Sequence, residues 1–438
     1  MVITLFGFIS TIIFTRVLGA DLLGVYYLFL AYFSIFNVFS EFGLGNGLVK
    51  KISEGEQELN YFSAYFTLRM IFLVAVTILL LFLIPTSEVF LWVIVALCAS
   101  FFSSTVTYWI LGTNKFSTYN LSKAMGELVR IILSIGLVLI GFSVGGLIGA
   151  FIVGLIFSGV LCLKYFKIKL IKPQKEYLID LLKFSTCIAV VNLVAILIGY
   201  SDTVILSIFG DTGDIGVYRV VLQFASVLLL AANAYNTIIY PKLSFYAKND
   251  MTEFNKILSN SIICSLVIGI PCCFGGILLS EPAIFYLYGV DFVCGTGVFC
   301  VLLVYYLLSI FSTLYATALS AKNQVFVLFK INIAVLVVNI VLNVVLFYLM
   351  GIVGIAISSL ICVFLQVLLE KKVLGKIGFD GLFMTKICFS TLIMCIVLIV
   401  LGEINSLETL ILNIGIGICV YFIVLLLIGK EMFIMLKT

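Results

Sequence analysis

The chain is divided into long uncharged runs by short segments that carry most of its charge. A run of about 20 apolar residues is long enough to cross the hydrocarbon core of a bilayer as a helix. Only 11% of the 438 residues are charged and 63% are hydrophobic, whereas soluble domains carry roughly 25% charged residues. We therefore predict an all-α polytopic membrane protein and exclude a soluble globular one. The runs predict about fourteen transmembrane helices, at 1–18, 22–48, 61–84, 89–112, 123–141, 144–163, 181–209, 216–240, 256–280, 295–320, 327–348, 351–369, 384–402 and 409–429.

The positions of the lysines predict how the spans are oriented across the membrane. They all lie in or beside the segments that follow even-numbered spans, and the segments after odd-numbered spans hold none. Positively charged loops remain in the cytoplasm. The pattern therefore predicts a multi-pass protein of the cell (inner or plasma) membrane with both termini in the cytoplasm.

The connections between spans are short, and this excludes several function classes. The longest polar connection covers about 164–183, so a receptor or enzyme with an extramembrane head is excluded. The chain has no histidine, which removes a common general base and metal ligand. It also lacks the phosphate-binding loop of ATPases. The net charge of +4 gives no indication of a nucleic-acid partner. We expect no catalysis, no metal and no organic cofactor.

An internal repeat organises the predicted helices. Gly24-Val25-Tyr26 recurs as Gly216-Val217-Tyr218, and Gly146-Leu147-Ile148-Gly149 is matched by Gly351-Ile352-Val353-Gly354. Repeated bundles around a central site are a transporter design, although small-residue packing of membrane helices gives similar matches. The repeat predicts four parts: an N-lobe at 1–165, a cytoplasmic linker at 166–180, a C-lobe at 181–370, and two further helices with a tail at 371–438.

Charged residues inside the predicted spans are the candidate functional residues, because charge at such depth usually faces a cavity or a partner. We predict ion coupling, to H⁺ or Na⁺, at Glu41, Glu127 and Asp202. Polar residues at helical spacing lie on the same helix faces as the arginines and form polar stripes with them. The predicted substrate-binding residues are Arg16, Tyr65, Arg69, Arg130, Arg219, Gln223 and Asn233.

Structural alternatives remain open for these residues. Glu127 and Arg130 have the spacing of a mutual ion pair on one helix. Arg16, Arg69 and Arg219 could instead extend to the membrane interfaces. Asp202 could cap or pair locally.

Short motifs support a family resemblance. The first half carries Arg16-Val17-Leu18-Gly19 and Glu41-Phe42-Gly43-Leu44, and the second half carries Pro241-Lys242-Leu243 and Tyr288-Gly289. With the repeated glycine motifs, they resemble polysaccharide (O-antigen-type) flippases of the multidrug/oligosaccharidyl-lipid/polysaccharide exporter superfamily. The resemblance implies two six-helix lobes around a central cavity, alternating access, and a polyprenyl-pyrophosphate-linked oligosaccharide as cargo. It implies membrane lipid and polysaccharide assembly proteins as partners. It also implies a cytoplasmic segment before the first span, so we expect a start upstream of Met1.

Two related functions and one unrelated function compete with this interpretation. A multidrug or cation antiporter of the same superfamily would favour a cavity dominated by acids, whereas the charges here include four arginines. A lipid II flippase has cargo of the same chemical class. A membrane-embedded glycan polymerase would need a sizeable outer loop. Arginine suits a pyrophosphate because its guanidinium donates paired hydrogen bonds and stays charged.

Overall fold

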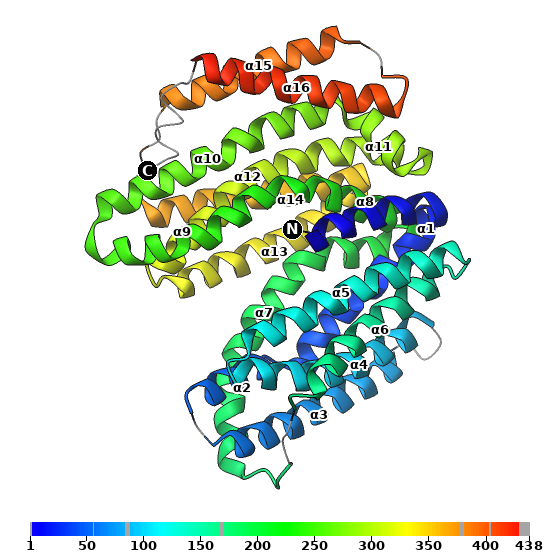
Figure 1. Ribbon diagram of the computed structural model, residues 1–438, viewed down its shortest axis with the longest axis vertical. Helices are drawn as coiled ribbons and strands as arrows, with labels where there is room; N and C mark the ends of the chain where they lie inside the picture. Colours follow the sequence, from blue (N-terminus) through cyan, green and yellow to red (C-terminus); the bar gives the residue numbers. More distant parts are fainter. Residues whose placement is uncertain are drawn as a thin grey trace. The chain divides into compact units, whose positions relative to one another are not determined.

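The computed structural model is built from helices joined by short turns (Figure 1). Within the described residues it contains no strand. Twelve helices of the described chain are long and apolar enough to cross a membrane. The prediction of an all-α polytopic membrane protein is therefore confirmed. The structure describes residues 2–55, 57–83, 88–166, 170–375, 378, 381–402 and 404–428.

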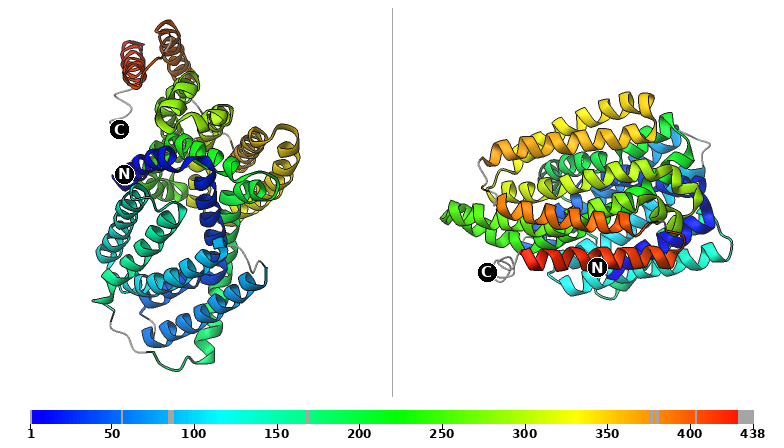
Figure 2. Two further views of the ribbon diagram at one scale, coloured as in Figure 1. Left: turned by 90° about the vertical axis from the view of Figure 1, so that its right-hand side faces the viewer. Right: turned by 90° about the horizontal axis from the view of Figure 1, so that it is seen from above.

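The predicted number of fourteen spans is approximate. The helix α5 has the length to cross a membrane, but its polar face keeps it out of the group of twelve. The spans predicted at 1–18 and 22–48 correspond to the two parts of α1, which is interrupted at Gly19, where the backbone is not helical. Gly19 has φ of 75°, a conformation that glycine adopts without steric cost. Figure 2 shows the two parts of α1 running in different directions.

Contacts divide the chain into two compact units, 1–216 and 217–438. Unit 1 holds α1 and the helices up to the start of α8. They are α1 (Val2–Glu41), α2 (Leu44–Ser53), α3 (Glu58–Leu83), α4 (Glu88–Gly112), α5 (Phe116–Leu139), α6 (Val144–Leu163), α7 (Lys175–Phe209) and the first turn of α8 (Thr212–Ala225).

Unit 2 begins within α8. Its other elements are η1 (Ser226–Leu229), α9 (Leu230–Asn249), α10 (Met251–Leu278), α11 (Ser280–Tyr288), η2 (Val290–Gly295), α12 (Thr296–Ala321), α13 (Val325–Met350), α14 (Ile352–Leu374), α15 (Gly381–Val400) and α16 (Leu407–Ile428).

The boundary between the two packed units differs from the boundary between the two repeats that the sequence predicts. The helix α7, which the sequence assigns to the C-lobe, packs against α1, α2 and α3 of unit 1. The lobe, linker and tail boundaries inferred from the repeat stay predictions about internal similarity.

The repeated Gly-Val-Tyr motifs meet where α1 crosses the first turn of α8. A Cβ atom on Gly24 would lie 1.7 Å from the carbonyl oxygen of Thr212, and one on Gly216 would lie 2.0 Å from that of Ala20. Only a residue without a side chain fits such a backbone contact. The repeat thus places two glycines on the two sides of one helix crossing.

Two pairs of consecutive predicted spans, 123–141 with 144–163 and 327–348 with 351–369, form helical hairpins. The turn between α5 and α6 contains Gly141 with φ of 99°, and the turn between α13 and α14 contains Gly351 with φ of 61°. Each hairpin packs along its length, α5 on α6 and α13 on α14. Small residues permit this closeness, as at Gly126 and Gly154, where an added Cβ would meet the backbone of the facing helix.

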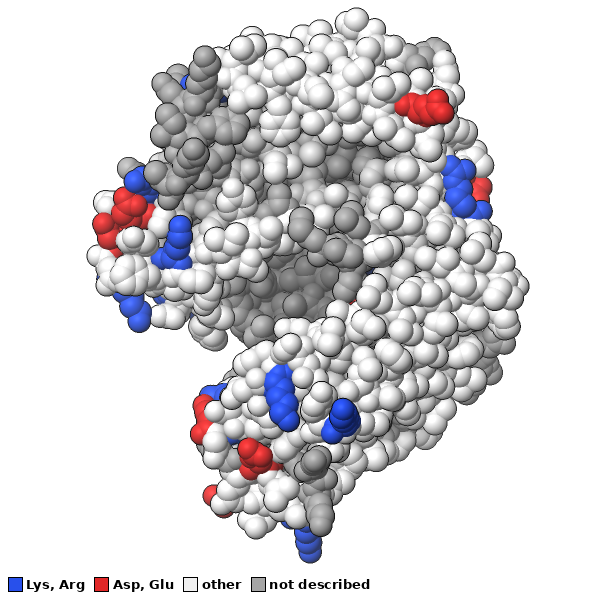
Figure 3. Space-filling view, viewed as in Figure 1, with Lys and Arg blue, Asp and Glu red and all other residues white. Residues whose placement is uncertain are grey.

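Charged side chains are sparse on the molecular surface. Figure 3 shows them in a few separate groups on an otherwise uncharged face. The sidedness of the lysines relative to a membrane remains a prediction. Five of the lysines used for it lie outside the described residues: Lys167, Lys169, Lys376, Lys430 and Lys437.

Candidate functional site

A tight turn after α1 positions Glu41, a predicted ion-coupling residue. Phe42 and Gly43 both have positive φ, 47° and 66°, and the chain reverses there into α2. A Cβ atom on Gly45 would lie 2.3 Å from the ring of Tyr108 on α4. Since Gly45 has none, that ring packs against α2, and its hydroxyl donates a 2.5 Å hydrogen bond to Oε1 of Glu41. The Glu-Phe-Gly motif therefore serves to hold a carboxylate against α4.

Arg69 lies on α3 next to this carboxylate and has no solvent-exposed surface. Its Nη1 donates a 2.7 Å hydrogen bond to the hydroxyl of Tyr65. Its guanidinium carbon lies 5.8 Å from the ring centres of both Tyr65 and Phe101. Its Nε and Nη2 are buried without a hydrogen-bond partner. Glu41 and Tyr108 are close enough to act on its charge. Such a cation retains unused donors, which suits an anion binder, but in this conformation no cargo can reach it.

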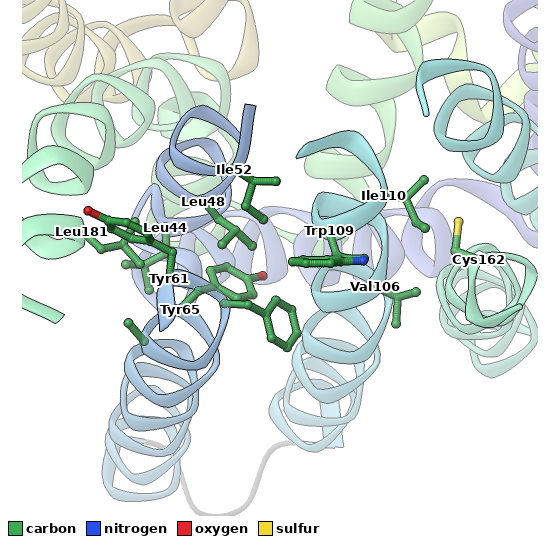
Figure 4. Close-up of a cluster of buried hydrophobic side chains, with 12 residues drawn as sticks. Leu44, Leu48, Ile52, Tyr61, Tyr65, Val106, Trp109, Ile110, Cys162 and Leu181 are labelled. Carbon is green, nitrogen blue, oxygen red and sulfur yellow. The ribbon is translucent and has the colours of Figure 1, made fainter. Parts of the chain in front are cut away.

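A hydrophobic cluster supports the first turns of α3. It joins α2, α3, α4, α6 and α7, and Figure 4 shows its side chains converging between these helices. Tyr65 is fully buried in this cluster, so its hydroxyl has a fixed position from which to accept the Arg69 hydrogen bond. The cluster consists of Leu44, Leu48, Ile52, Tyr61, Phe62, Ala64, Tyr65, Val106, Trp109, Ile110, Cys162 and Leu181.

A polar network ties α2 to α7 beside the same cluster. The Nζ of Lys51 lies 2.7 Å from Oδ2 of Asp180, and the Tyr61 hydroxyl donates a 2.8 Å hydrogen bond to the same oxygen. The Asp180 carboxylate raises the pKa of Lys51, which stabilises the charged ammonium. This network fixes α2, and with it the turn that carries Glu41.

Arg130 and Glu127 form an ion pair on α5. The Nε and Nη2 of Arg130 lie 2.8 and 2.7 Å from Oε2 of Glu127, so the structural alternative, a mutual pair, is present. The guanidinium keeps partial exposure. A Cβ on Gly154 of α6 would lie 2.9 Å from Cβ of Arg130, which shows how closely α6 covers the stem of this side chain.

The other predicted residues of unit 1 lie apart from the Arg69 cluster. Arg16 is exposed, one turn before the kink in α1. Asp202 is 8% exposed on α7, and Ser201 contacts its Oδ1 at 3.5 Å. The structure thus brings Glu41, Tyr65 and Arg69 together and leaves Arg16 and Asp202 elsewhere in unit 1.

In unit 2 the predicted polar stripe is interrupted. The span predicted at 216–240 is a helix, α8, then the 3₁₀ segment η1, then α9. The Ser226 hydroxyl donates to the carbonyl oxygen of Gln223 at 2.7 Å, a local bond that competes with regular helix. Arg219 and Gln223 are half-buried on α8, and Asn233 is exposed on α9. The predicted stripe assumes the period of an α-helix throughout. The 3₁₀ segment has fewer residues per turn, so the polar residues before and after it do not form one continuous stripe.

Three features were missed from the sequence. Tyr108 and Phe101 on α4 complete the surroundings of Glu41 and Arg69, yet aromatic residues in an apolar span resemble ordinary packing. Glu370, near the end of α14, is fully buried. It directly precedes Lys371 and Lys372. Because these lysines indicate the end of a span, the sequence contains no sign that Glu370 is buried.

An apolar crevice of about 260 Å³ lies within unit 2. Helices α10, α11, α12, α15 and α16 contribute to it, and Pro271, Gly275, Met394 and Tyr421 are among its lining residues. Such a surface favours a hydrocarbon chain over any polar ligand. In the described residues, no group of three or more His, Cys, Asp or Glu side chains could hold a metal ion.

Two known proteins are similar to this chain. It is 26% identical to a "Probable low-salt glycan biosynthesis flippase Agl15" of Haloferax volcanii over 446 residues, which cover 96% of this chain and 92% of that protein. It is also 26% identical to a "Probable flippase AglR" of the same organism over 270 residues, 60% of this chain and 56% of that protein.

Solved structures share the fold. The "Lipid II flippase MurJ, inward closed conformation" has a TM-score of 0.82 at 21% identity, covering 99% of this chain and 98% of that one. An inward-facing multidrug resistance MATE family transporter has a TM-score of 0.66 at 16% identity, covering 85% and 94%. At these identities the likeness concerns the fold alone.

A family model described as "Polysaccharide biosynthesis protein" matches residues 1–247. This match covers more than half of the chain, and it confirms the resemblance carried by the short motifs. The protein belongs to the polysaccharide biosynthesis protein family.

Proposed function

We propose that this protein is a flippase that moves a polyprenyl-pyrophosphate-linked oligosaccharide from the cytoplasmic to the outer leaflet of the cell membrane. In this proposal it works by alternating access and has both termini in the cytoplasm. The observation that carries it is the similarity to a glycan biosynthesis flippase along nearly the whole of both chains.

The arginines supply the chemistry for the pyrophosphate. Arg69 has two buried donors without partners, and Arg16, Arg130 and Arg219 keep some exposure. Guanidinium groups bind phosphate oxygens through paired, charge-assisted hydrogen bonds. We assign Arg69 and Arg130, with Tyr65, to the inward-open stage. Arg16 and Arg219, with Gln223 and Asn233, would serve the outward-open stage. The Arg69 contact requires α3 and α4 to separate first, because this side chain is closed off here.

The crevice of unit 2 suits the lipid tail of the same cargo. Its lining is almost wholly apolar, so a hydrocarbon chain can lie there without a desolvation cost, and a sugar would find few hydrogen-bond partners. A polar head group in a sheltered cavity and a chain in such a crevice together require no covalent chemistry. This supports a transporter rather than an enzyme.

The proposed energy source is an ion gradient acting on buried acids. Asp202 is almost completely buried, and Glu41 accepts a short hydrogen bond from Tyr108. Asp202→Asn and Glu41→Gln should each reduce H⁺- or Na⁺-driven transport while the level of folded protein stays unchanged. Unchanged ion dependence in both variants would exclude these residues as the coupling sites.

The test of the function is flipping by the purified protein in lipid vesicles. Polyprenyl-pyrophosphate-linked sugar is placed in one leaflet, and its arrival in the other is measured with a membrane-impermeant enzyme that modifies the glycan. Vesicles with the protein should equilibrate the lipid, and protein-free vesicles should not. Equal protection of the sugar in both preparations would contradict the proposal.

Lipid II is the second candidate cargo, because the fold of unit 1 and unit 2 matches the lipid II flippase in an alignment of almost the full chain. In the same vesicles, lipid II and a glycan without peptide compete for transport. Faster transport of the glycan supports a surface-glycan flippase, and a preference for lipid II would assign that cargo. A cationic drug taken up in exchange for protons would instead indicate an antiporter.

A further inference from the structure

Glu370 is a buried acid that the proposed transport cycle has not yet used. It lies on α14 near the end of the helix, and its side chain has no solvent-exposed surface. The helices that pack against α14 are α12 and α13. Acids at such positions in membrane proteins are costly and are generally retained for a function.

The hydrogen bonds to Glu370 are all on one oxygen. Oε1 accepts from the Ser312 hydroxyl of α12 at 3.2 Å and from Nε2 of Gln366 at 2.9 Å. The same Nε2 lies 3.3 Å from Oδ1 of Asn332 on α13. Oε2 is buried without any partner. The carboxyl group thus links three helices through one of its two oxygens.

The surrounding charges do not neutralise an ionised Glu370. From α12 the titratable side chain that faces it is Tyr315, which is itself buried. On α13, the Nζ of Lys330 lies over the ring of Phe326. On α14, Lys371 and Lys372 are exposed. Among the described residues, no lysine or arginine forms an ion pair with Glu370.

This asymmetry matches a carboxylic acid rather than a carboxylate. The carbonyl oxygen of an acid accepts two hydrogen bonds, as Oε1 does, while the other oxygen carries the proton. A carboxylate needs donors on both oxygens or a cation when it is buried. Oε2 has neither in the described part of the chain.

We propose that Glu370 is a proton-binding site of unit 2 and that its proton is coupled to transport, in addition to the acids of unit 1; the coupling rests on the proposed flippase function. Releasing the proton leaves a charge that α12, α13 and α14 cannot solvate while they are packed as here. The ionised form therefore favours a conformation in which these helices separate and admit water. The conformational equilibrium and proton binding are linked through this one group.

The first measurement tests the site without any transport. Infrared spectroscopy of the purified full-length protein in lipid detects the C=O stretch of protonated carboxylic acids, apart from the carboxylate bands. The wild-type spectrum at neutral pH should contain a band that Glu370→Gln removes. Ser312→Ala should shift that band, because the carbonyl oxygen loses a donor. The control Glu253→Gln, at an exposed glutamate paired with Lys256, should leave it unchanged.

The second measurement tests coupling in vesicles with lipid-linked sugar. Glu370→Gln copies the shape of the protonated acid. Its amide nitrogen can take the place of Oε2, because no hydrogen-bond donor faces that position. The variant should therefore fold. It should lose the accumulation of lipid that a pH gradient drives in wild type. Glu370→Asp keeps a proton site and should recover part of that accumulation.

The outcomes separate the two proposals. If wild type flips no lipid-linked sugar, the proposed function fails, and the infrared band still decides whether Glu370 holds a proton. Absence of a band specific to Glu370 overturns the inference whatever the transport result. A Glu370→Gln variant that still accumulates lipid in response to pH also overturns it, as does accumulation driven by Na⁺ and not by pH.

Discussion

At the scale of single residues, the protein holds charge inside apolar helices with aromatic neighbours. Arg69 lies against two aromatic rings, and Glu41 accepts from a tyrosine hydroxyl. Rings shield these charges from lipid, and the hydroxyl groups satisfy part of their hydrogen-bonding capacity. Arg69 retains two donors without hydrogen-bond partners. Unpaired buried donors lower stability, so they are not expected of an arginine with a purely structural role.

Replacing Arg69 by methionine should impair transport. The variant keeps most of the side-chain volume, but it removes a cation from beside the Glu41 carboxylate and should lower stability, so stability is measured separately from transport. Each charge-assisted hydrogen bond to the pyrophosphate contributes about 1.5–3 kcal/mol, so flipping should fall roughly tenfold or more. Arg69→Lys keeps the positive charge but loses the paired donors of the guanidinium, so its flipping rate should be intermediate.

Flipping in vesicles and thermal unfolding measure the two effects. Lys256→Met serves as the matched control, because Lys256 is exposed and pairs only locally with Glu253. A native flipping rate in Arg69→Met would show that this arginine does not bind cargo.

Removing the Tyr108 hydroxyl should destabilise the turn that carries Glu41. Tyr108→Phe keeps the ring and loses one charge-assisted hydrogen bond, with an expected loss of about 1.5–3 kcal/mol in the free energy of unfolding. Gly45→Ala should have a similar effect for a steric reason, since its Cβ would overlap the Tyr108 ring. Denaturant unfolding in detergent checks both. Tyr240→Phe, at an exposed tyrosine, is the control, and equal stability of all four proteins would refute this account.

At the scale of helices, glycines set how closely the elements approach. The crossing of α1 with the start of α8 leaves no room for a Cβ on Gly24 or Gly216. Gly149 on α6 has nothing within 4 Å of where its Cβ would be. Glycines of the two repeated motifs thus differ in structural importance: contact requires Gly24 and Gly216, and it does not require Gly149.

Alanine substitutions distinguish these glycines. Gly24→Ala or Gly216→Ala forces a methyl group against backbone and should cost about 1–3 kcal/mol or more in the free energy of unfolding. Gly149→Ala should be neutral or stabilising by up to about 1 kcal/mol, because alanine is the better helix former. The double variant at the crossing should cost less than the sum, since both changes act on one contact. A Gly24→Ala protein as stable as Gly149→Ala would contradict the crossing.

At the scale of the whole molecule, the apolar helices and the likeness to solved structures agree on a polytopic membrane fold. The direction of the chain in the membrane follows from the lysines and is still a prediction. The turn between α5 and α6 and the segment before α7 should lie on opposite sides.

Cysteine labelling tests this topology. Gly145→Cys and Lys172→Cys, each in a background without the native cysteines, should react with a membrane-impermeant maleimide from opposite sides of sealed vesicles. Both positions are exposed, and Gly145 has open space for a side chain. Labelling from the same side would overturn the topology, and with it the assignment of inner and outer arginines.

The sequence by itself determined the class of protein, most of its helices and its hairpins. Hydrophobic runs and glycine turns are local signals, because each is read from consecutive residues. For the same reason the i,i+3 spacing of Glu127 and Arg130 already indicated their ion pair. The break between the first two spans is a local signal as well, since it lies at Gly19, whose backbone is not helical.

The tertiary structure decided which polar residues meet. Tyr108 reaches Glu41 across 67 positions of the sequence, and Ser312 reaches Glu370 across 58. These contacts depend on how each helix is rotated against its neighbour, and in a span that is apolar on all sides the sequence contains little to fix that rotation. Close packing through glycine fixes it instead. It encloses Arg69, it leaves one oxygen of Glu370 without a partner, and both are properties of the assembled helices.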